Sequence, residues 1–483
     1  MSLSRAQRER VDAHLTKQRS SSVPLSNAVI TGVGPVSSIG CSRNGFWEAL
    51  LAGRSGFGPI TLCRAPESPS QVASEVKEFS LGDFVHKGEI MGRRTPRAVQ
   101  LGLAASVLAL HDAEIDLDGC DPDRLGVYVG TSIGNMAELL RLHEKLSTTG
   151  ELPAHTAFHA FHHSAACVIS SFFNIRGPIQ TASSGCNSGL DALGQSLRMI
   201  QSGAVDAMLV VGTDCEVVPE VIAALNASNS LSSRYNEEPH RASRPFDLGR
   251  DGNVIGEGAA AVFLESEEHA RRRGARIYAR MAGYQVCSAG QNRQYSHDSP
   301  ETDLRPCIRA FEGTLRETGW HPEQVEVVSA NGSSSKIYDR IEGQAISRVF
   351  RDHIGSLKVH STKSMLGQHG AGSSMLQVVS ASLTLRRGTI PPTINHEVPD
   401  PECGPLNVVT EADTIFPRRM LVHSIGLGGF YYSVGAFEAA EDIDDMQTGE
   451  IQVKWSETGH PIFKPRAEFE KPLSPWAPRR DTD

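Results

Sequence analysis

The cysteine at position 186 has the neighbours expected of a nucleophile. A predicted strand, residues 179–182, runs into a turn of small residues at 183–185, and Cys186 follows it directly. The next apolar residues fall on one face of a helix: Leu190, Leu193, Leu197 and Ile200. We therefore expect Cys186 at a strand-to-helix corner, where free backbone N–H groups and the positive helix end favour a thiolate. The alternative for a lone cysteine among small residues is an inert packing role.

Strand and helix patterns alternate along the chain and must position this corner. The first series contains such patterns at 28–40, 42–53, 101–113, 124–132 and 206–214. A second series begins near Ala279 and contains patterns at 325–335, 341–350, 374–388 and 420–438. The alternation predicts an α/β fold of two halves, with a mostly parallel sheet covered on both faces by helices.

Composition divides the chain into four parts. Residues 1–26 are polar and are expected to form an extension outside the fold. The two α/β halves are predicted over 27–278 and 279–441, and residues 442–483 are a polar tail that contains prolines. We expect no chemistry in the extension or in the tail.

Charge and cysteine usage exclude several classes of function. The net charge is −9 and no block of five or six lysines and arginines is present, so neither nucleic acid nor an anionic membrane is an expected partner. The nine cysteines show neither CxxC pairs nor the spacing of a zinc site, which predicts a reducing compartment and no structural metal. No stretch approaches eighteen uninterrupted apolar residues, and we expect a cytoplasmic protein.

Several motifs resemble one enzyme family. The segment TASSGCNSGLDALG around Cys186 resembles the nucleophile motif of the β-ketoacyl synthases, and is most like the ketosynthase subunits of bacterial aromatic (type II) polyketide systems. The loop SRPFDLGRDGNVIGEGAAAVFLE, residues 243–265, resembles the family's signature loop, with Asn253 where an aromatic residue is usual. Later family blocks follow in the expected order at 361–375, 385–395 and 424–430.

The resemblance implies a fold, partners and a reaction. Such enzymes have the thiolase-like fold, in which two similar α/β halves stack in five layers, and they form dimers through an edge strand. Here that strand is either 179–182 or the strand near Leu209. An acyl group passes from the phosphopantetheine arm of an acyl carrier protein to the cysteine, with no further cofactor. Two histidines then promote decarboxylation of a malonyl carrier protein.

Carried over residue by residue, the resemblance assigns the acylated nucleophile to Cys186. Asn331 and Gln368 stand at the positions of the family's two histidines. His369 aligns one position late, and a one-residue slip of its glycine-rich loop would let it replace the second histidine.

Three further residues match supporting positions. Lys363 and Glu342 match a charged pair beside the family's active site, for which a purely structural ion pair is the alternative. Leu427 stands where the family has a gating phenylalanine, and its backbone N–H with that of Cys186 would form the oxyanion hole.

The amides at the histidine positions limit the chemistry that we expect. Asn and Gln donate hydrogen bonds but do not move protons near neutral pH. We therefore predict a carrier-protein-dependent acyltransferase or condensing enzyme of polyketide or fatty-acid-like biosynthesis, acylated on Cys186 and poor at decarboxylation. The alternative is a non-elongating partner subunit, like a chain-length factor, in a heterodimer with an active ketosynthase rather than a homodimer.

Overall fold

The computed structural model describes residues 26–154, 156–290, 300–426 and 431–440, together with 454–455 and 461–462. The predicted extension, residues 1–26, and the predicted tail, residues 442–483, therefore lie almost entirely outside the described residues. Within the tail only the short strands β16 (Lys454–Trp455) and β17 (Pro461–Ile462) are described.

Five strands of each half have the same order. The first half contains β1 (Ala28–Val36), β4 (Leu125–Gly130), β5 (Ile179–Ala182), β6 (Ala207–Cys215) and β7 (Ile255–Ser266). The second contains β8 (Ala279–Ser288), β9 (Val327–Ser329), β10 (Lys358–His360), β14 (Arg419–Ile425) and β15 (Tyr431–Ala439). Their spatial orders are β1-β7-β6-β4-β5 and β8-β15-β14-β9-β10, the same path in both halves. This repetition confirms the prediction of two similar α/β halves.

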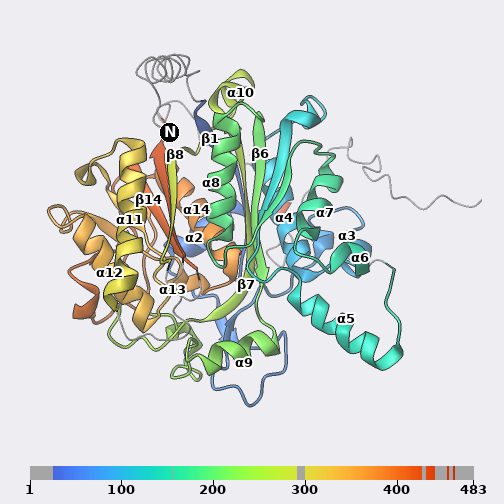
Figure 1. Ribbon diagram of the computed structural model, residues 1–483, viewed down its shortest axis with the longest axis horizontal. Helices are drawn as coiled ribbons and strands as arrows, with labels where there is room; N and C mark the ends of the chain where they lie inside the picture. The colour runs from blue at the N-terminus through green and yellow to red at the C-terminus, as the bar shows by residue number, and fades with distance from the viewer. Residues whose placement is uncertain are drawn as a thin grey trace, which may run out of the picture.

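The helices complete five layers (Figure 1). On one outer side, α4 (Arg97–Asp112) and α7 (Ser164–Phe173) pack on the first set of strands, and on the other side α11 (Pro300–Thr318) and α12 (Lys336–Val349) cover the second set. Between the two sets lie α8 (Ser188–Gln201) and α14 (Gly370–Arg387), and α14 is buried on all sides from Gly370 to Leu385. The prediction of a thiolase-like α/β fold is confirmed.

The expectation of a mostly parallel sheet is wrong. β4 runs parallel to β5 and β6, and β9 runs parallel to β10 and β14. The central pairs β1/β7, β6/β7, β14/β15, β8/β15 and β1/β8 are antiparallel. The last two strands of each half therefore run in opposite directions, and the sheet is mixed.

The edge of the first half is β5. It pairs with β4, whereas β6, which contains Leu209, is enclosed by β4 and β7. Of the two strands predicted as candidates for a dimer edge, only residues 179–182 are therefore free to pair with another chain.

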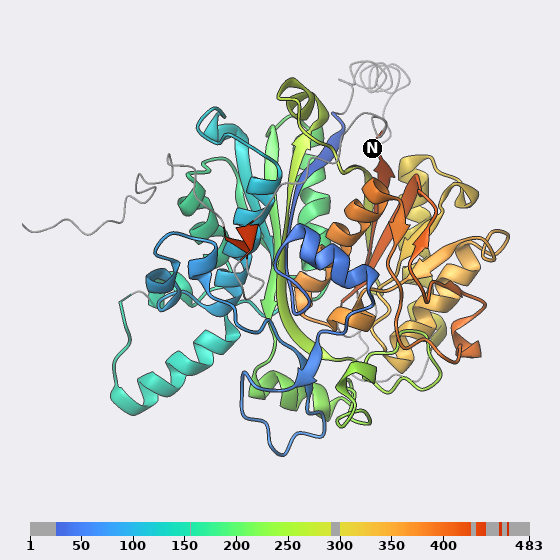
Figure 2. The ribbon, with the colours of Figure 1, turned by 180° about the vertical axis from the view of Figure 1, so that it is seen from behind.

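Smaller elements surround these layers. The back view shows α2 (Arg43–Leu51), in blue, over the middle of the molecule near the orange helix α14 (Figure 2). The Ser42 side chain caps α2 by accepting from the Gly45 N–H. The other elements are β2 (Phe57–Pro59), β3 (Val72–Ser74), α3 (Gly88–Gly92), α5 (Met136–Thr149), α6 (Thr156–His159), α9 (Pro219–Ala227), α10 (Glu267–Arg272), β11 (Thr389–Ile390), β12 (Asn407–Val408) and β13 (Asp413–Thr414). In the described parts of the chain no helix is long and apolar enough to cross a membrane.

Candidate active site

Cys186 lies at the predicted corner between β5 and α8. Gly185 turns the chain with φ of +74°, a backbone conformation that favours glycine, and α8 begins at Ser188. A Cβ added to Gly189 would lie 2.5 Å from the carbonyl oxygen of Ala371, so the first turn of α8 packs closely against the first turn of α14. Cys186 is 6% exposed and lies where the N-terminal ends of the two central helices meet.

The thiol of Cys186 is not the thiolate that its position predicts. Burial raises the pKa of Cys186 to about 12, and the nearby carboxyl groups of Glu216 and Asp214 act in the same direction. The Lys363 ammonium and a hydrogen bond from the Gln368 side chain lower the pKa, but by less. The cost of burying a charge therefore exceeds the stabilisation from the helix end, and the free protein holds a neutral thiol at neutral pH.

The side-chain amide of Asn331 has a fixed orientation. Its Oδ1 accepts from Lys363 Nζ at 2.8 Å and from the Ile425 N–H at 3.2 Å. An ammonium and a backbone N–H can only donate, so both require oxygen at this position. Asn331 is 2% exposed, and its Nδ2 is the group left to donate to a bound substrate.

Lys363 and Glu342 meet on Asn331 rather than on each other, so the prediction of a direct charged pair is wrong. Glu342 accepts from the backbone N–H groups of Asn331 at 2.6 Å and Gly332 at 2.8 Å, and lies 2.5 Å from His423 Nδ1. Lys363 Nζ donates to both oxygens of Asn331. Burial lowers the pKa of Lys363 to about 8, against the opposing effect of the Glu342 charge. The two charged groups position Asn331 from opposite sides.

Gln368 lies beside the thiol. Its backbone N–H donates to the Val254 carbonyl at 2.8 Å, and it pairs with Ile255 at the start of β7. Its side chain hydrogen-bonds Cys186, whereas its Oε1 is buried without a hydrogen-bond partner. The short helix α13 (Lys363–Leu366) ends two residues before Gln368. Lys363 and Gln368 therefore belong to the same short segment of the chain.

His369 does not reach Cys186 in this structure. It precedes α14, is 1% exposed, and its ring lies beside Gly256 and Gly258 of β7. Burial, with the charge of Lys363, lowers the pKa of His369 to about 3, so the ring is neutral. No hydrogen bond joins this described ring to the Cys186 thiol, which gives no support to the predicted replacement of a catalytic histidine.

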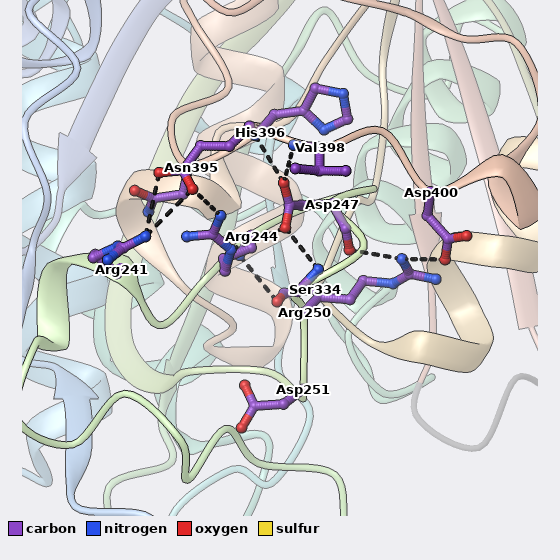
Figure 3. Close-up of polar contacts among 12 residues, drawn as sticks. Arg241, Arg244, Asp247, Arg250, Asp251, Ser334, Asn395, His396, Val398 and Asp400 are labelled. Atoms are coloured by element: carbon purple, nitrogen blue, oxygen red, sulfur yellow. Dashed lines mark hydrogen bonds and ion pairs between the residues drawn. The ribbon is translucent and has the colours of Figure 1, made fainter.

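A polar network in the signature loop, residues 243–265, holds the Asn331 loop (Figure 3). Asp247 accepts from Arg244 Nε and from three backbone N–H groups, those of Gly249, Glu397 and Val398. The Arg244 N–H donates to Ser334 Oγ at 3.0 Å, and Arg250 pairs with Asp400 at 2.6 Å. These contacts tie three loops together and fix the segment that carries Asn331.

Sequence reasoning missed the carboxyl groups of Asp214 and Glu216. Both are buried near Cys186, at the end of β6. The available signal was the pair of acidic residues in TDCE at the end of an otherwise apolar strand. Two buried carboxyl groups beside a nucleophile are candidates for proton transfer.

Two further sequence predictions concern Leu427 and the absence of a structural metal. Leu427, predicted for the oxyanion hole and the gate, lies outside the described residues. Over the part of the chain that the structure describes, no three His, Cys, Asp or Glu side chains are arranged to hold a metal ion.

A buried cysteine at the head of a central helix, between two similar α/β halves, is the arrangement of a protein with the thiolase-like fold. The family model "Beta-ketoacyl synthase, N-terminal domain" matches residues 26–270, and "Beta-ketoacyl synthase, C-terminal domain" matches residues 278–397. The chain belongs to the β-ketoacyl synthase family.

Known proteins agree with this assignment. The chain is 36% identical to a 3-oxoacyl-[acyl-carrier-protein] synthase 2 from Coxiella burnetii, over 83% of this chain and 96% of that protein. Among solved structures, the ketosynthase of a type II polyketide synthase, determined with its acyl-carrier protein, matches with a TM-score of 0.77 and 29% identity, over 86% of this chain and 100% of that one. The ishigamide ketosynthase/chain length factor matches with a TM-score of 0.78 and 29% identity over the same shares of the two chains.

Proposed function

We propose that this protein takes an acyl group from an acyl carrier protein onto Cys186 and passes it to a second substrate, in fatty acid or polyketide biosynthesis. The observation that carries the proposal is the position of Cys186 at the meeting point of α8 and α14, beside the Gln368 amide and close to Lys363, whose ammonium holds the Asn331 amide. Similar proteins named as 3-oxoacyl-[acyl-carrier-protein] synthases, and a ketosynthase in complex with its acyl-carrier protein, support a carrier-bound substrate.

The two amides suit the binding of a carbonyl group. Asn331 has Nδ2 available and Gln368 donates toward Cys186, so both can stabilise negative charge on the oxygen of a thioester. Neither amide takes up or releases a proton near neutral pH. We therefore propose that loading of Cys186 is efficient, and that decarboxylation of a malonyl carrier protein is slow.

The test is the intact mass of the protein after incubation with a panel of acyl carrier proteins. We expect a shift by the mass of one acyl group in the wild type, and none in Cys186→Ala. A wild type that stays unmodified with every carrier would contradict the proposal.

The same experiment addresses a second role. Because the amides cannot replace proton-moving histidines, a non-elongating partner of an active ketosynthase is the other function consistent with this site. One structural neighbour is named as a ketosynthase/chain length factor. A protein of that kind would stay unloaded, yet raise chain extension when mixed with the active ketosynthase.

A further inference from the structure

Glu216 and Gln368 lie on the same side of β7, whose other side pairs with β3 at these residues. The Glu216 N–H donates to the Gly256 carbonyl at 3.2 Å, and Gln368 pairs with the neighbouring residue Ile255. Because Gln368 hydrogen-bonds Cys186, the first residues of β7 connect Glu216 to the nucleophile on a short path. Among the ionisable groups around the Cys186 thiol, Glu216 also has the strongest effect on it.

The Glu216 and Asp214 carboxyl groups meet at the first turn of α14. A Cβ added to Gly370 would lie 2.9 Å from Glu216 Oε1 and 2.2 Å from Asp214 Oδ2. This turn of α14 also packs against the start of α8, which follows Cys186. Both carboxyl groups are therefore at the corner that carries the thiol.

The two carboxyl groups differ in the number of hydrogen bonds that they accept. Asp214 accepts from four donors: Thr131 Oγ1 at 2.8 Å and the backbone N–H groups of Ser132 at 2.7 Å, Ile133 at 3.1 Å and Ala371 at 2.7 Å. Glu216 accepts from one backbone N–H, that of Gly370. Burial raises the pKa of both groups, to about 6 for Asp214, and the Asp214 charge raises that of Glu216 further. At neutral pH Asp214 therefore carries the negative charge and Glu216 keeps its proton.

The acyl transfer needs a group of this kind. Cys186 is a neutral thiol and must lose its proton on acylation, while the sulfur of the departing carrier must gain one. Asn331 and Gln368 cannot move protons, and the Lys363 ammonium is held on Asn331. A neutral carboxyl group can accept a proton on its carbonyl oxygen while it gives up the proton of its hydroxyl oxygen.

We propose that Glu216 is the proton shuttle of this active site. This proposal rests on the acyl transfer to Cys186 proposed above. On acylation, the S–H proton of Cys186 moves to one oxygen of Glu216 as the sulfur attacks the thioester carbonyl carbon. The carbon–sulfur bond to the carrier then breaks, and the proton on the other oxygen passes to the departing sulfur. One carbon–sulfur bond forms and one breaks, and Glu216 ends as it began, as a neutral acid.

The test compares two reactions of Cys186 in Glu216→Gln, which keeps the size of the side chain and cannot shuttle a proton. We expect acylation by a loaded carrier protein to slow by roughly 10²-fold, the usual worth of a positioned acid or base. Alkylation of Cys186 by iodoacetamide requires only a thiolate and no proton for a departing carrier. We expect its rate to stay within about twofold of wild type, because a neutral amide replaces a neutral acid and leaves the charge around the thiol unchanged.

Three outcomes would overturn the shuttle: unchanged acylation, acylation and alkylation that fall together, or both that rise together. Glu216→Asp keeps a carboxyl group on a shorter side chain, and its Cys186 should be acylated faster than that of Glu216→Gln. This variant provides a test even if Glu216→Gln folds poorly. The wild type could fail to be loaded by any carrier protein and yet be acylated by an acyl-N-acetylcysteamine thioester. This result would contradict the proposed dependence on a carrier protein, but not the role of Glu216. In that case the small thioester tests Glu216 by the same comparison.

Discussion

Lys363 Nζ lies 2.8 Å from Asn331 Oδ1 and 3.0 Å from the Asn331 carbonyl oxygen, so one buried ammonium fixes both the side chain and the backbone of one residue. Lys363 itself is 2% exposed. Its partners are dipoles, because the nearest carboxylate, Glu342, bonds to Asn331 from the other side. The site therefore contains a buried ammonium, that of Lys363, which is stabilised mostly by amide oxygens.

The buried ammonium predicts a pH dependence of stability. Burial lowers the pKa of Lys363 from 10.5 to about 8 in the folded protein. Between these values the unfolded chain binds more protons, so the contribution of Lys363 to the free energy of unfolding should rise as the pH rises from 8 to 10.5, and be constant at its lowest value below about pH 8, where Lys363 is protonated in both states. Urea unfolding of the wild type and Lys363→Met at pH 8 and pH 10 should show the difference between the two change by on the order of 2 kcal/mol. A difference that is independent of pH would show that Lys363 titrates normally.

The buried thiol predicts an order of cysteine modification. Cys186 is buried with its pKa raised to about 12, whereas Cys167 is exposed. At pH 7 we expect iodoacetamide to modify Cys167 before Cys186, and the rate at Cys186 to rise by up to about tenfold for each unit of pH above 7. Peptide mapping by mass spectrometry after timed quenching measures both rates. If Cys186 were modified first at pH 7, the helix ends would lower the pKa of its thiol by more than burial raises it.

Restoring histidines predicts a gain of decarboxylation. Each donor or proton-moving group at such a site is worth about two to three orders of magnitude in rate. We expect wild type to release little carbon dioxide from labelled malonyl carrier protein, and the double variant Asn331→His/Gln368→His to release more. The control is the same double variant with Cys186→Ala, which should form no chain-extended product. Rapid release by the wild type would return the protein to the elongating ketosynthases.

The edge strand predicts a dimer. Pro178 and Ala182 direct their carbonyl groups to β4, so the backbone groups of Ile179 and Thr181 point away from it. Ile179 is also 43% exposed, and an unprotected edge of this kind favours pairing with a second chain. We expect a dimer at micromolar concentration by light scattering, and a monomer for Ile179→Lys, which places a charged side chain on the edge strand. Ile415→Lys is the matched control, because Ile415 is 36% exposed and lies away from this edge. A dimeric Ile179→Lys would place the interface elsewhere.

Local patterns were sufficient to predict the elements around the nucleophile. Residues 179–182 form a strand as predicted, and the apolar face of α8, with Leu190, Leu193, Leu197 and Ile200, is buried as its spacing requires. The motif around Cys186 also indicated the family and the five-layer fold. These features depend on neighbouring residues and on periodicity, which the sequence states directly.

The charge state and the contacts of the site depended on residues far apart in the chain. Burial of Cys186 between α8 and α14 raises the pKa of the thiol by more than the helix ends lower it. The reason is that removing a thiolate from water costs more free energy than its interaction with the helix ends provides. Lys363 and Glu342, expected to pair, are instead separated by Asn331. The carboxyl groups of Asp214 and Glu216 come within reach of the thiol only when β6 packs against α14. The amino-acid sequence by itself therefore predicted the family, the two similar α/β halves and the corner that carries Cys186, whereas only tertiary packing decided which groups hold protons, since desolvation depends on what surrounds each group in space.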